Sequence, residues 1–401
     1  MRIIIIGGGA SGLMSAISAK NSNNDVTIIE CNGDIAKKIL VTGNGRCNYC
    51  HEDINNSSYY TDDENNLKEI LNNQSEVFEQ LTSFGLVPKN KDGYFYPLSN
   101  QASSVRDMFK YQLAKKNIKV INEFKVIDIQ KKGDTFLIKS ENETLECDSI
   151  IIATGSNAGL KEENDTIYKI LRELGHSTNP IMPSLVPLIV EGAKKYNWAG
   201  IRTDAELTLI SDYKVIKEER GELQLTNDGI SGIVTFNISG FASRELAKHN
   251  DVSVQINFLP DIKDIHAYLD ERDKIMGHVT MNELLNSLLN YKLTGLLLHL
   301  SHIDGDISYQ DLKDHQLNWL IKNISSFECN IIDTEDFSRA QVCTGGLSLS
   351  EIDPQTMEST IISNLYIIGE ILDVDGECGG YNLAFAFITG YLAGKCLSCL
   401  E

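Results

Sequence analysis

The chain has 401 residues, a length that predicts about two or three domains and a core large enough for an enzyme. Its 56 acidic residues outnumber its 36 lysines and arginines, and the formal charge of −20 disfavours nucleic acid as a general ligand. With 42% hydrophobic residues, no apolar run near the ~18 residues that span a bilayer and no signal-peptide pattern, the composition predicts a soluble, cytoplasmic globular protein without a membrane partner.

The first thirty residues predict a βαβ unit that opens a parallel sheet. Residues 3–6 form a β-branched run, apolar residues at helical spacing begin at Leu13, and a second β-branched run covers residues 26–29. Strand, tight turn, helix and strand in this order form the first step of a doubly wound α/β fold.

The turn of this unit has the sequence GGGASG, with the GxGxxG spacing of a dinucleotide-binding fingerprint. The first glycine permits the sharp turn, the second lets a pyrophosphate approach the backbone, and the third lets the helix pack on the strand. The helix N-terminus offers N–H groups and positive potential to the anion. A carboxylate at the end of the second strand accepts hydrogen bonds from a ribose and repels a 2′-phosphate. The candidate cofactor-binding residues here are Gly7, Gly9, Ala10, Ser11, Gly12 and Glu30.

The middle of the chain predicts an inserted domain. Strands continue the first domain as far as residue 155, and prolines at positions 180, 183 and 187 then interrupt the chain. Residues 206–235 alternate like antiparallel strands, and leucines from position 284 to 300 form a helical stripe typical of core packing. After residue 339 the glycines return in pairs, before a strand at 366–368 and a final helix at 383–397. The expected domains are residues 1–180, an insert at 181–338 with a helical part at about 260–325, and a return to the first domain at 339–401.

Three further features indicate FAD rather than NAD as the dinucleotide. The segment KKILVTGNGRCN, residues 37–48, directly follows the ribose acid, and the strand at 149–153 closes on Thr154-Gly155 like the second short fingerprint of flavoproteins. The segments LYIIGE and GGYNLA, at 365–370 and 379–384, resemble the C-terminal flavoprotein motif, where an acid binds the ribityl chain and a helix start faces the flavin. A second strand-GxGxxG-helix pattern is missing from the sequence, so NAD(P)H would dock only transiently.

The motifs GGGASG, TGNGRCN, GISG, TMES and GEILDVDGECGGYNLAFA together resemble the aminoacetone-oxidase-like, BaiN-type family of NAD(P)/FAD-dependent oxidoreductases, or YhiN-like flavoproteins. The resemblance spans nearly the whole chain. It implies a Rossmann-like FAD-binding domain made from both ends of the chain, with an insert that combines a small β-barrel and a helical part and covers a non-covalently bound flavin. By matching position it also implies cofactor contacts at Lys38, Gly43, Gly45, Arg46, Cys47, Asn48, Gly369, Glu370, Asp373, Asn382 and Leu383. The candidate set is completed by Val126, Thr154, Gly155 and Gly380.

The chain departs from the family pattern in two places. After Ala153-Thr154-Gly155 it continues with SNAGLKEENDTIYKIL instead of a Ser-Tyr-Pro and glycine-rich stretch. In the insert, Asn227 and Ile233 stand where the family has His and Pro. Asn forms hydrogen bonds but does not transfer a proton near pH 7, so any acid or base role of that His requires another group here.

These features predict an FAD-dependent oxidoreductase that transfers hydride between the flavin and a small organic substrate, with NAD(P)H as a transient donor. The family resemblance allows reduction of an enone-like double bond or oxidation of a small amine. The candidate catalytic residues are Arg46, Cys47 and Tyr381. A flavin-bearing redox sensor without turnover is the alternative, and an RNA-modifying flavoprotein would require a basic face that the lysines do not form.

The nine cysteines raise the question of metal or haem binding. Cys47, Cys50 and His51 match the CxxCH pattern of covalent haem, and the same thiols match a redox dithiol beside a flavin. Cys396 and Cys399 form a second CxxC, which would complete a zinc site only if the two pairs met. We expect no metal, because the first pair lies in the flavin segment and the second near the end of the chain. The oligomeric state is open.

Overall fold

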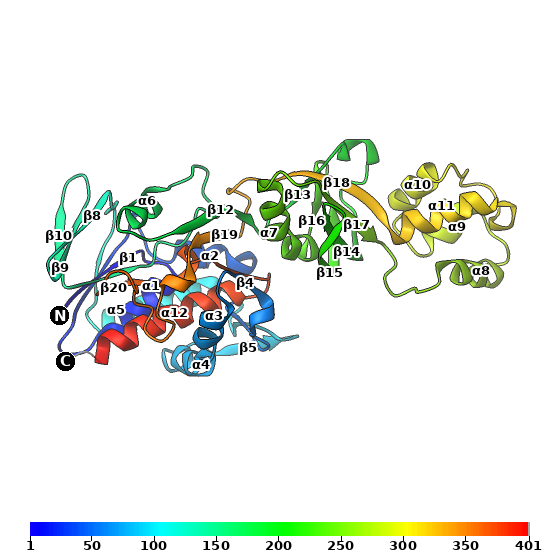
Figure 1. Cartoon of the computed structure of the whole chain (residues 1–401). Helices are drawn as coiled ribbons and strands as arrows, with labels where there is room; N and C mark the ends of the chain where they lie inside the picture. Colours follow the sequence, from blue (N-terminus) through cyan, green and yellow to red (C-terminus); the bar gives the residue numbers. More distant parts are fainter. Residues whose placement is uncertain (400–401) are drawn as a thin grey trace. The chain divides into compact units, whose positions relative to one another are not determined.

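The computed structural model describes residues 1–399 and divides into two units, Met1–Ile181 with Val342–Glu401 and Met182–Gln341 (Figure 1). Each unit has a hydrophobic core of its own. The first unit is therefore built from both ends of the chain, and the second is inserted into it. The sequence predicts junctions at 180/181 and 338/339, and the structure divides the chain at 181/182 and 341/342.

A five-stranded parallel sheet forms the centre of the first unit. Its strand order is β20-β11-β1-β2-β7, and residues 3–6 of β1 are buried because the strand has neighbours on both sides. This order confirms the predicted Rossmann-type fold. The strands are β1 (Arg2–Ile6), β2 (Asp25–Ile29), β7 (Lys119–Ile121), β11 (Ser149–Ile152) and β20 (Leu365–Ile367).

The first and last helices of this unit, α1 (Ala10–Ala19) and α12 (Tyr381–Cys399), pack on each other (Figure 1). Two glycines of α12 allow the close approach. A Cβ atom on Gly390 would lie 2.4 Å from the carbonyl oxygen of Ser11, and one on Gly394 would lie 2.5 Å from that of Ser15. The C-terminal helix thus lies directly beside the helix that begins at the glycine fingerprint.

Smaller elements surround this layer. A three-stranded meander contains β8, β9 and β10, a second small sheet contains β3, β6 and β5, and two strand pairs are β21-β4 and β12-β19. Their bounds, with those of the remaining helices of the unit, are α2 (Lys37–Val41), η1 (Thr42–Gly45), β3 (Cys50–His51), η2 (Asn56–Ser58), β4 (Tyr59–Thr61), α3 (Glu64–Leu71), α4 (Gln74–Ser83), β5 (Pro88–Lys91), β6 (Tyr94–Pro97), α5 (Ala102–Lys115), β8 (Asp128–Lys132), β9 (Thr135–Lys139), β10 (Thr144–Cys147), α6 (Thr166–Glu173), β12 (Thr178–Ser184), β19 (Val342–Leu347), η5 (Leu349–Glu351), η6 (Gly369–Ile371) and β21 (Val374–Gly376).

The second unit contains a closed six-stranded barrel with the order β13-β16-β15-β14-β17-β18 and a separate helical part, as the resemblance implies. The barrel strands are β13 (Leu188–Val190), β14 (Arg202–Ser211), β15 (Lys214–Leu225), β16 (Gly229–Ser231), β17 (Val252–Asn257) and β18 (Phe327–Thr334). The helices of the unit are η3 (Ala193–Tyr196), α7 (Ile233–Ala247), α8 (Ile265–Met276), α9 (Met281–Asn286), α10 (Tyr291–Leu300), η4 (Tyr309–Asp311) and α11 (Asp314–Ser325).

Two local expectations for this unit are wrong. Strand alternation was expected to continue to Thr235, but α7 begins at Ile233, after Gly232 turns the chain with a φ of +97°. The leucine stripe was expected on one helix, but it is divided between α9 and α10. Asn290 begins the second helix by accepting a hydrogen bond from the backbone N–H of Lys292 (3.0 Å).

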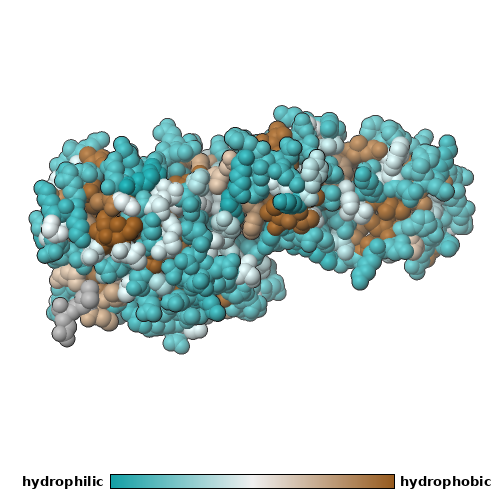
Figure 2. All heavy atoms as spheres, in the orientation of Figure 1, coloured by the Kyte–Doolittle hydropathy of each residue, from teal (hydrophilic) through white to brown (hydrophobic). Residues whose placement is uncertain are grey.

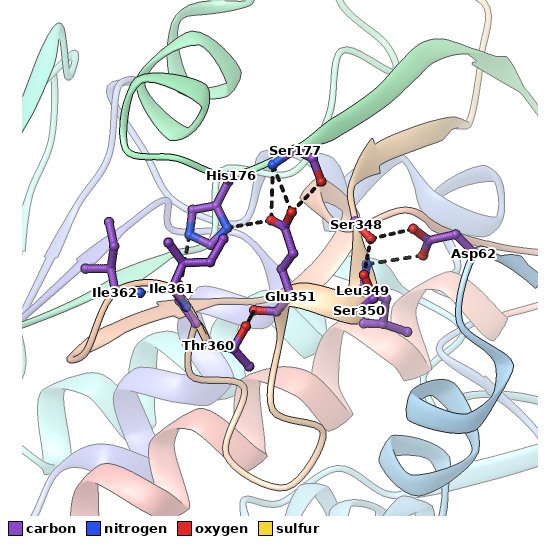
Figure 3. Close-up of polar contacts among 11 residues, drawn as sticks. Asp62, His176, Ser177, Ser348, Leu349, Ser350, Glu351, Thr360, Ile361 and Ile362 are labelled. Atoms are coloured by element: carbon purple, nitrogen blue, oxygen red, sulfur yellow. Dashed lines mark hydrogen bonds and ion pairs between the residues drawn. The ribbon is translucent and has the colours of Figure 1, made fainter.

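A polar cluster fixes the segment by which the chain returns to the first unit (Figure 3). His176 Nδ1 lies 2.8 Å from Glu351 Oε2, and His176 Nε2 lies 3.0 Å from Ser359 Oγ. This order of side chains is that of a hydrolytic triad, yet Ser359 is only 5% exposed and its Oγ accepts hydrogen bonds from the N–H groups of Ile361 and Ile362. A hydroxyl oxygen so engaged does not act as a nucleophile, so the cluster holds the turn in place.

Within residues 1–399, no helix combines the length and the apolarity that a membrane crossing requires. Figure 2 shows one face of the molecule, where a mostly hydrophilic surface is interrupted by separate hydrophobic patches.

Candidate functional site

Three glycines of the fingerprint have different roles: Gly7 and Gly9 lie in the turn between β1 and α1, and Gly12 lies in the first turn of α1. Gly7 has a φ of +110°, and a Cβ atom there would lie 2.3 Å from the carbonyl oxygen of Ala153. A Cβ atom on Gly12 would lie 2.0 Å from the carbonyl oxygen of Gly7. Gly9 differs from both, because its φ of −82° and ψ of −168° suit any residue and a Cβ atom would meet no other atom within 4 Å. The protein itself therefore requires Gly7 and Gly12, whereas the space above Gly9 is open to a ligand at the N-terminus of α1.

The C-terminal motif meets this turn directly. Ser11 is buried in the first turn of α1, next to Ala10, and a Cβ atom on Gly369 would lie 2.6 Å from Ser11 Oγ. Gly369 also has a φ of +76°, and its N–H donates to Thr389 Oγ1 of α12 (3.0 Å). Ser11 and Gly369, more than 350 residues apart in the sequence, thus lie in close contact at the fingerprint.

Glu30 lies at the end of β2, where the fingerprint requires the ribose acid. It is 8% exposed, and its Oε2 accepts a hydrogen bond from the N–H of Gly8 (2.8 Å). Its Oε1 accepts from the backbone N–H and the side-chain amide of Asn32 (2.9 and 2.6 Å). The carboxylate is thus oriented at the edge of the fingerprint turn, and Asn32 is an orienting residue that the sequence pattern did not indicate.

The neighbouring Cys31 is an exposed thiol whose Sγ lies 3.4 Å from Glu30 Oε1. Partial burial and the Glu30 charge raise the pKa of Cys31 to about 11. We expect bound FAD to slow alkylation of Cys31 by iodoacetamide about tenfold, because the adenosine ribose would cover it. Peptide mass spectrometry measures the rate, with the exposed thiol of Cys399 as the internal control. Equal Cys31 rates with and without FAD would place the adenosine away from Glu30.

A second group of candidates meets at the ends of β11 and β19. Lys38 Nζ donates to the carbonyl oxygen of Ser156 (3.2 Å) and lies 3.7 Å from Glu370 Oε2. Ser156 Oγ donates to Glu370 Oε1 (2.6 Å), as does the N–H of Cys343 (3.2 Å). A Cβ atom on Gly155, which follows Thr154, would lie 3.9 Å from both Lys38 Nζ and Glu370 Oε2. The structure therefore brings together the candidates Lys38, Gly155 and Glu370, and adds Ser156 and Cys343.

The loop at residues 42–48 reaches the start of α12. Gly43 and Gly45 have φ of +54° and +79°, which turns the chain so that Arg46 is exposed. The Oδ1 atom of Asn48 is buried without a hydrogen-bond partner among residues 1–399, and a Cβ atom on Gly380 would lie 2.8 Å from it. A buried acceptor without a partner is rare in native proteins. The Oδ1 atom of Asn48 therefore favours a ligand nearby that donates a hydrogen bond to it.

The first turn of α12 is held by contacts of Asn382 and Tyr381. Asn382 binds Gly376 twice, with Oδ1 accepting from the backbone N–H (2.9 Å) and Nδ2 donating to the carbonyl oxygen (2.8 Å). The Tyr381 ring stacks on His51 at 5.1 Å between centroids, and Tyr59 Oη donates to the Tyr381 carbonyl oxygen (2.9 Å). The N–H groups at this end of a 19-residue helix are therefore held rigidly, and they attract negative charge.

The other candidates lie around these groups. Asp373 is 3% exposed, and its Oδ2 accepts a hydrogen bond from Asn179 Nδ2 (2.6 Å). Leu383 is partly buried against the core of the first unit. Val126 is 6% exposed and belongs to the same core, between β7 and β8.

The thiols of the first CxxC are deeply buried. Cys47 and Cys50 are 0% and 3% exposed, and burial raises their pKa to about 11 and about 12. Both thiols therefore stay protonated at neutral pH, which disfavours nucleophilic or thiolate redox chemistry. All nine cysteines are free, and no cluster of three or more metal-binding side chains occurs in the part of the chain that the structure describes.

Comparison with known proteins gives consistent matches over the whole chain. A family model described as HI0933-like protein Rossmann domain matches residues 1–396. The 3-dehydro-bile acid delta(4,6)-reductase of Clostridium scindens is 37% identical over 405 residues, covering 98% of each chain. The ribosomal RNA dihydrouridine synthase of Escherichia coli is 26% identical over 399 residues, covering 98% of this chain and 96% of the relative.

Solved structures show the same fold at low identity. The 3-ketosteroid-delta4-(5alpha)-dehydrogenase of Rhodococcus jostii has a TM-score of 0.52 at 11% identity, with 99% of this chain and 96% of that chain covered. A flavocytochrome c3 fumarate reductase has a TM-score of 0.51 at 12% identity, with 99% and 78% covered.

Proposed function

Because this chain belongs to the HI0933-like family and is thus an FAD-dependent oxidoreductase, we propose that it reduces a carbon–carbon double bond conjugated to a carbonyl in a small organic substrate. Membership of the family, with a reductase as a 37% identical relative, favours an enzyme over the redox sensor that the sequence left as the alternative.

The observation that carries this proposal is the reaction shared by the names of the relatives. A delta(4,6)-reductase acting on a 3-dehydro compound reduces double bonds conjugated to the 3-oxo group. A dihydrouridine synthase reduces the uracil double bond, which is also conjugated to a carbonyl. Both names are consistent with reduction of an electron-poor double bond, although the substrates differ greatly in size and charge.

The structure offers a fitting place for the cofactor. The open space above Gly9 suits a pyrophosphate, the oriented Glu30 carboxylate suits a ribose, and the start of α12 suits the pyrimidine edge of a flavin. We infer non-covalent binding, because these contacts are backbone N–H groups and carboxylates. When bound, FAD accepts two electrons from a donor and delivers them to the substrate as hydride.

Two side chains are proposed to act on the substrate. Arg46 is exposed in the loop at residues 42–48, and its guanidinium stabilises the negative charge that develops on the substrate carbonyl oxygen. Burial raises the pKa of Tyr381, so its hydroxyl holds a proton at neutral pH and donates it to the α-carbon. In this proposal Tyr381 supplies the proton. Asn227, which stands where the family has His, does not transfer one. Cys47 has no step in this proposal, since its thiol is buried and protonated.

We further propose a small molecule, and not ribosomal RNA, as the substrate. The second unit contains 15 lysines and arginines against 24 acidic residues, which leaves it a net charge of −9. Such a unit repels a phosphate backbone, whereas a neutral molecule experiences no such repulsion.

A steady-state assay of NADH and NADPH oxidation with matched substrates tests the proposal. We expect turnover with a 4-en-3-one steroid or a simple cyclic enone, and none with the corresponding isolated alkene or with a uridine-containing ribosomal RNA fragment. Activity on the isolated alkene, or reduction of the flavin by a small primary amine with no enone turnover, would contradict it. If only the RNA is reduced, the substrate is a nucleic acid and the proposed small-molecule substrate is wrong.

A further inference from the structure

His51 is the last residue of the CxxCH pattern, and the structure turns it away from the neighbouring thiol. Cys50 and His51 are consecutive in β3, so their side chains point to opposite faces of the small sheet β3-β6-β5. Cys50 is 3% exposed, whereas His51 is partly exposed. The pattern therefore does not gather its side chains at one point, and the contacts of His51 lie on the other face of the sheet.

The imidazole ring of His51 is held in one orientation. Its Nδ1 accepts a hydrogen bond from the backbone N–H of Asp53 (3.1 Å). Tyr94, which is directly opposite His51 in β6, lies edge to face with the imidazole ring at 4.8 Å between centroids and an interplanar angle of 74°. His51 is thus a flat surface whose position is set by its own neighbours.

This surface covers the ring of Tyr381, the first residue of α12. The two rings stack at 5.1 Å between centroids, with an angle of 27° between their planes. Tyr59 lies edge to face with Tyr381 at 5.8 Å and 88°, and a Cβ atom on Gly376 would lie 2.7 Å from Tyr381 Cβ. The phenol is therefore confined by the ring of His51, the ring of Tyr59 and the backbone of Gly376.

Confinement of the phenol matters because the rate of a proton transfer depends steeply on where the donor lies. A displacement of about 1 Å can lower a rate by about 100-fold. We propose that His51 is a positioning residue, which holds the Tyr381 phenol in the orientation from which it donates its proton. The proposal rests on the proposed function and on the role of Tyr381 in it. The proton passes from Tyr381 Oη to the α-carbon as the β-carbon receives hydride from the flavin, and water then returns a proton to the phenolate.

Three substitutions at this position separate the ring from the hydrogen bond. His51→Ala removes both, His51→Asn keeps an acceptor for the N–H of Asp53 without a ring, and His51→Phe keeps a flat ring without the acceptor. With a conjugated enone, we expect kcat to fall by about tenfold to 100-fold in the first two variants, while KM stays within about threefold of the wild type. His51→Phe should recover most of the rate, because the stacked ring and not the hydrogen bond confines Tyr381.

Two kinetic measurements show whether the loss arises in the proton transfer. Rapid mixing should give an unchanged rate of flavin reduction by NAD(P)H in all three variants. The solvent deuterium isotope effect on flavin reoxidation by the enone should be larger in His51→Ala than in the wild type, because proton transfer then limits that step. His266→Ala removes an exposed histidine of the second unit and should change neither rate.

The position of the Tyr381 ring can also be measured without turnover. Fluorine NMR of 3-fluorotyrosine placed at position 381 reports the packing of this ring. We expect a signal well separated from that of the denatured protein in the wild type and in His51→Phe. In His51→Ala and His51→Asn the signal should be narrower and closer to the denatured position, because the released ring averages over several orientations.

Several results would overturn the proposal. An unchanged kcat in His51→Ala would mean that the stack has no part in the reaction. Recovery by His51→Asn but not by His51→Phe would assign the effect to the hydrogen bond with Asp53. An unchanged fluorine signal in His51→Ala would show that Tyr59 and Gly376 hold the phenol without His51. If the wild type reduces no enone, the proposed function fails, and the fluorine spectra still decide whether His51 positions Tyr381.

Discussion

Replacing Gly9 with valine should strongly weaken FAD binding and leave the fold intact. In the structure a Cβ atom on Gly9 meets nothing within 4 Å, and the backbone there is extended, so the protein does not itself require glycine. A pyrophosphate at the N-terminus of α1 does require it, since side-chain atoms would occupy the space of the approaching phosphate. We expect FAD affinity to fall by about 100-fold or more, equivalent to about 2.7 kcal/mol, while unfolding stability changes by less than about 1 kcal/mol.

The matched control is Gly12→Val, three residues further along the chain in the first turn of α1. A Cβ atom there would lie 2.0 Å from the carbonyl oxygen of Gly7, so this variant should be strongly destabilised or fail to fold. Flavin fluorescence titration and chemical denaturation separate the two effects. A Gly9→Val protein that binds FAD as tightly as the wild type would place the cofactor elsewhere.

Replacing Arg46 with alanine should slow enone reduction by about 100-fold without loss of FAD. The guanidinium is exposed in the loop at residues 42–48, where we propose that it stabilises the developing negative charge of the carbonyl oxygen. Loss of one such donor typically costs about 100-fold to 1,000-fold in rate. Rapid-mixing kinetics follow the two half-reactions separately, and the reduction of the flavin by NAD(P)H should change by less than about threefold.

Two further variants test whether the loss of rate depends on the position of Arg46 and on its charge. Arg46→Lys keeps the charge but loses the planar fork, so it should recover part of the rate. Arg202→Ala removes an exposed arginine of the second unit and should have no effect. If Arg46→Ala releases FAD, then Arg46 holds the cofactor and the substrate role is wrong. If both half-reactions keep their wild-type rates, Arg46 has no part in either.

Local patterns predicted much of the fold. The βαβ unit is predictable because Gly7, Gly12 and the flanking β-branched runs act within thirty residues of each other. The errors occur where local pattern and tertiary structure disagree. Thr235 continues an alternating pattern, but Gly232 ends the strand and the helix packs on the barrel. The leucine stripe has helical spacing on both sides of Asn290, and spacing alone does not reveal a cap that begins a second helix.

The candidate site shows the same limit. Motifs predicted Lys38 and Glu370, but no motif indicated that Ser156 and the backbone of Cys343 would bind the same carboxylate. That contact joins the segment after β11 to the start of β19, almost 190 residues further along the chain. The two strands belong to different sheets, so no local pattern indicates that these segments meet. A motif also does not indicate that the side chain of Asn382 forms two hydrogen bonds with the backbone of Gly376, although Asn382 itself is a predicted candidate.

An anaerobic spectral experiment in two steps tests the central claim most directly. The purified protein is reconstituted with FAD, reduced with one equivalent of NADH or NADPH, and then mixed with one equivalent of a conjugated enone. We predict that the oxidised-flavin absorbance disappears with one of the nucleotides, and that the enone restores it within the turnover time. A protein that does not bind FAD, or a reduced flavin that the enone leaves unchanged while oxygen reoxidises it, would contradict the account.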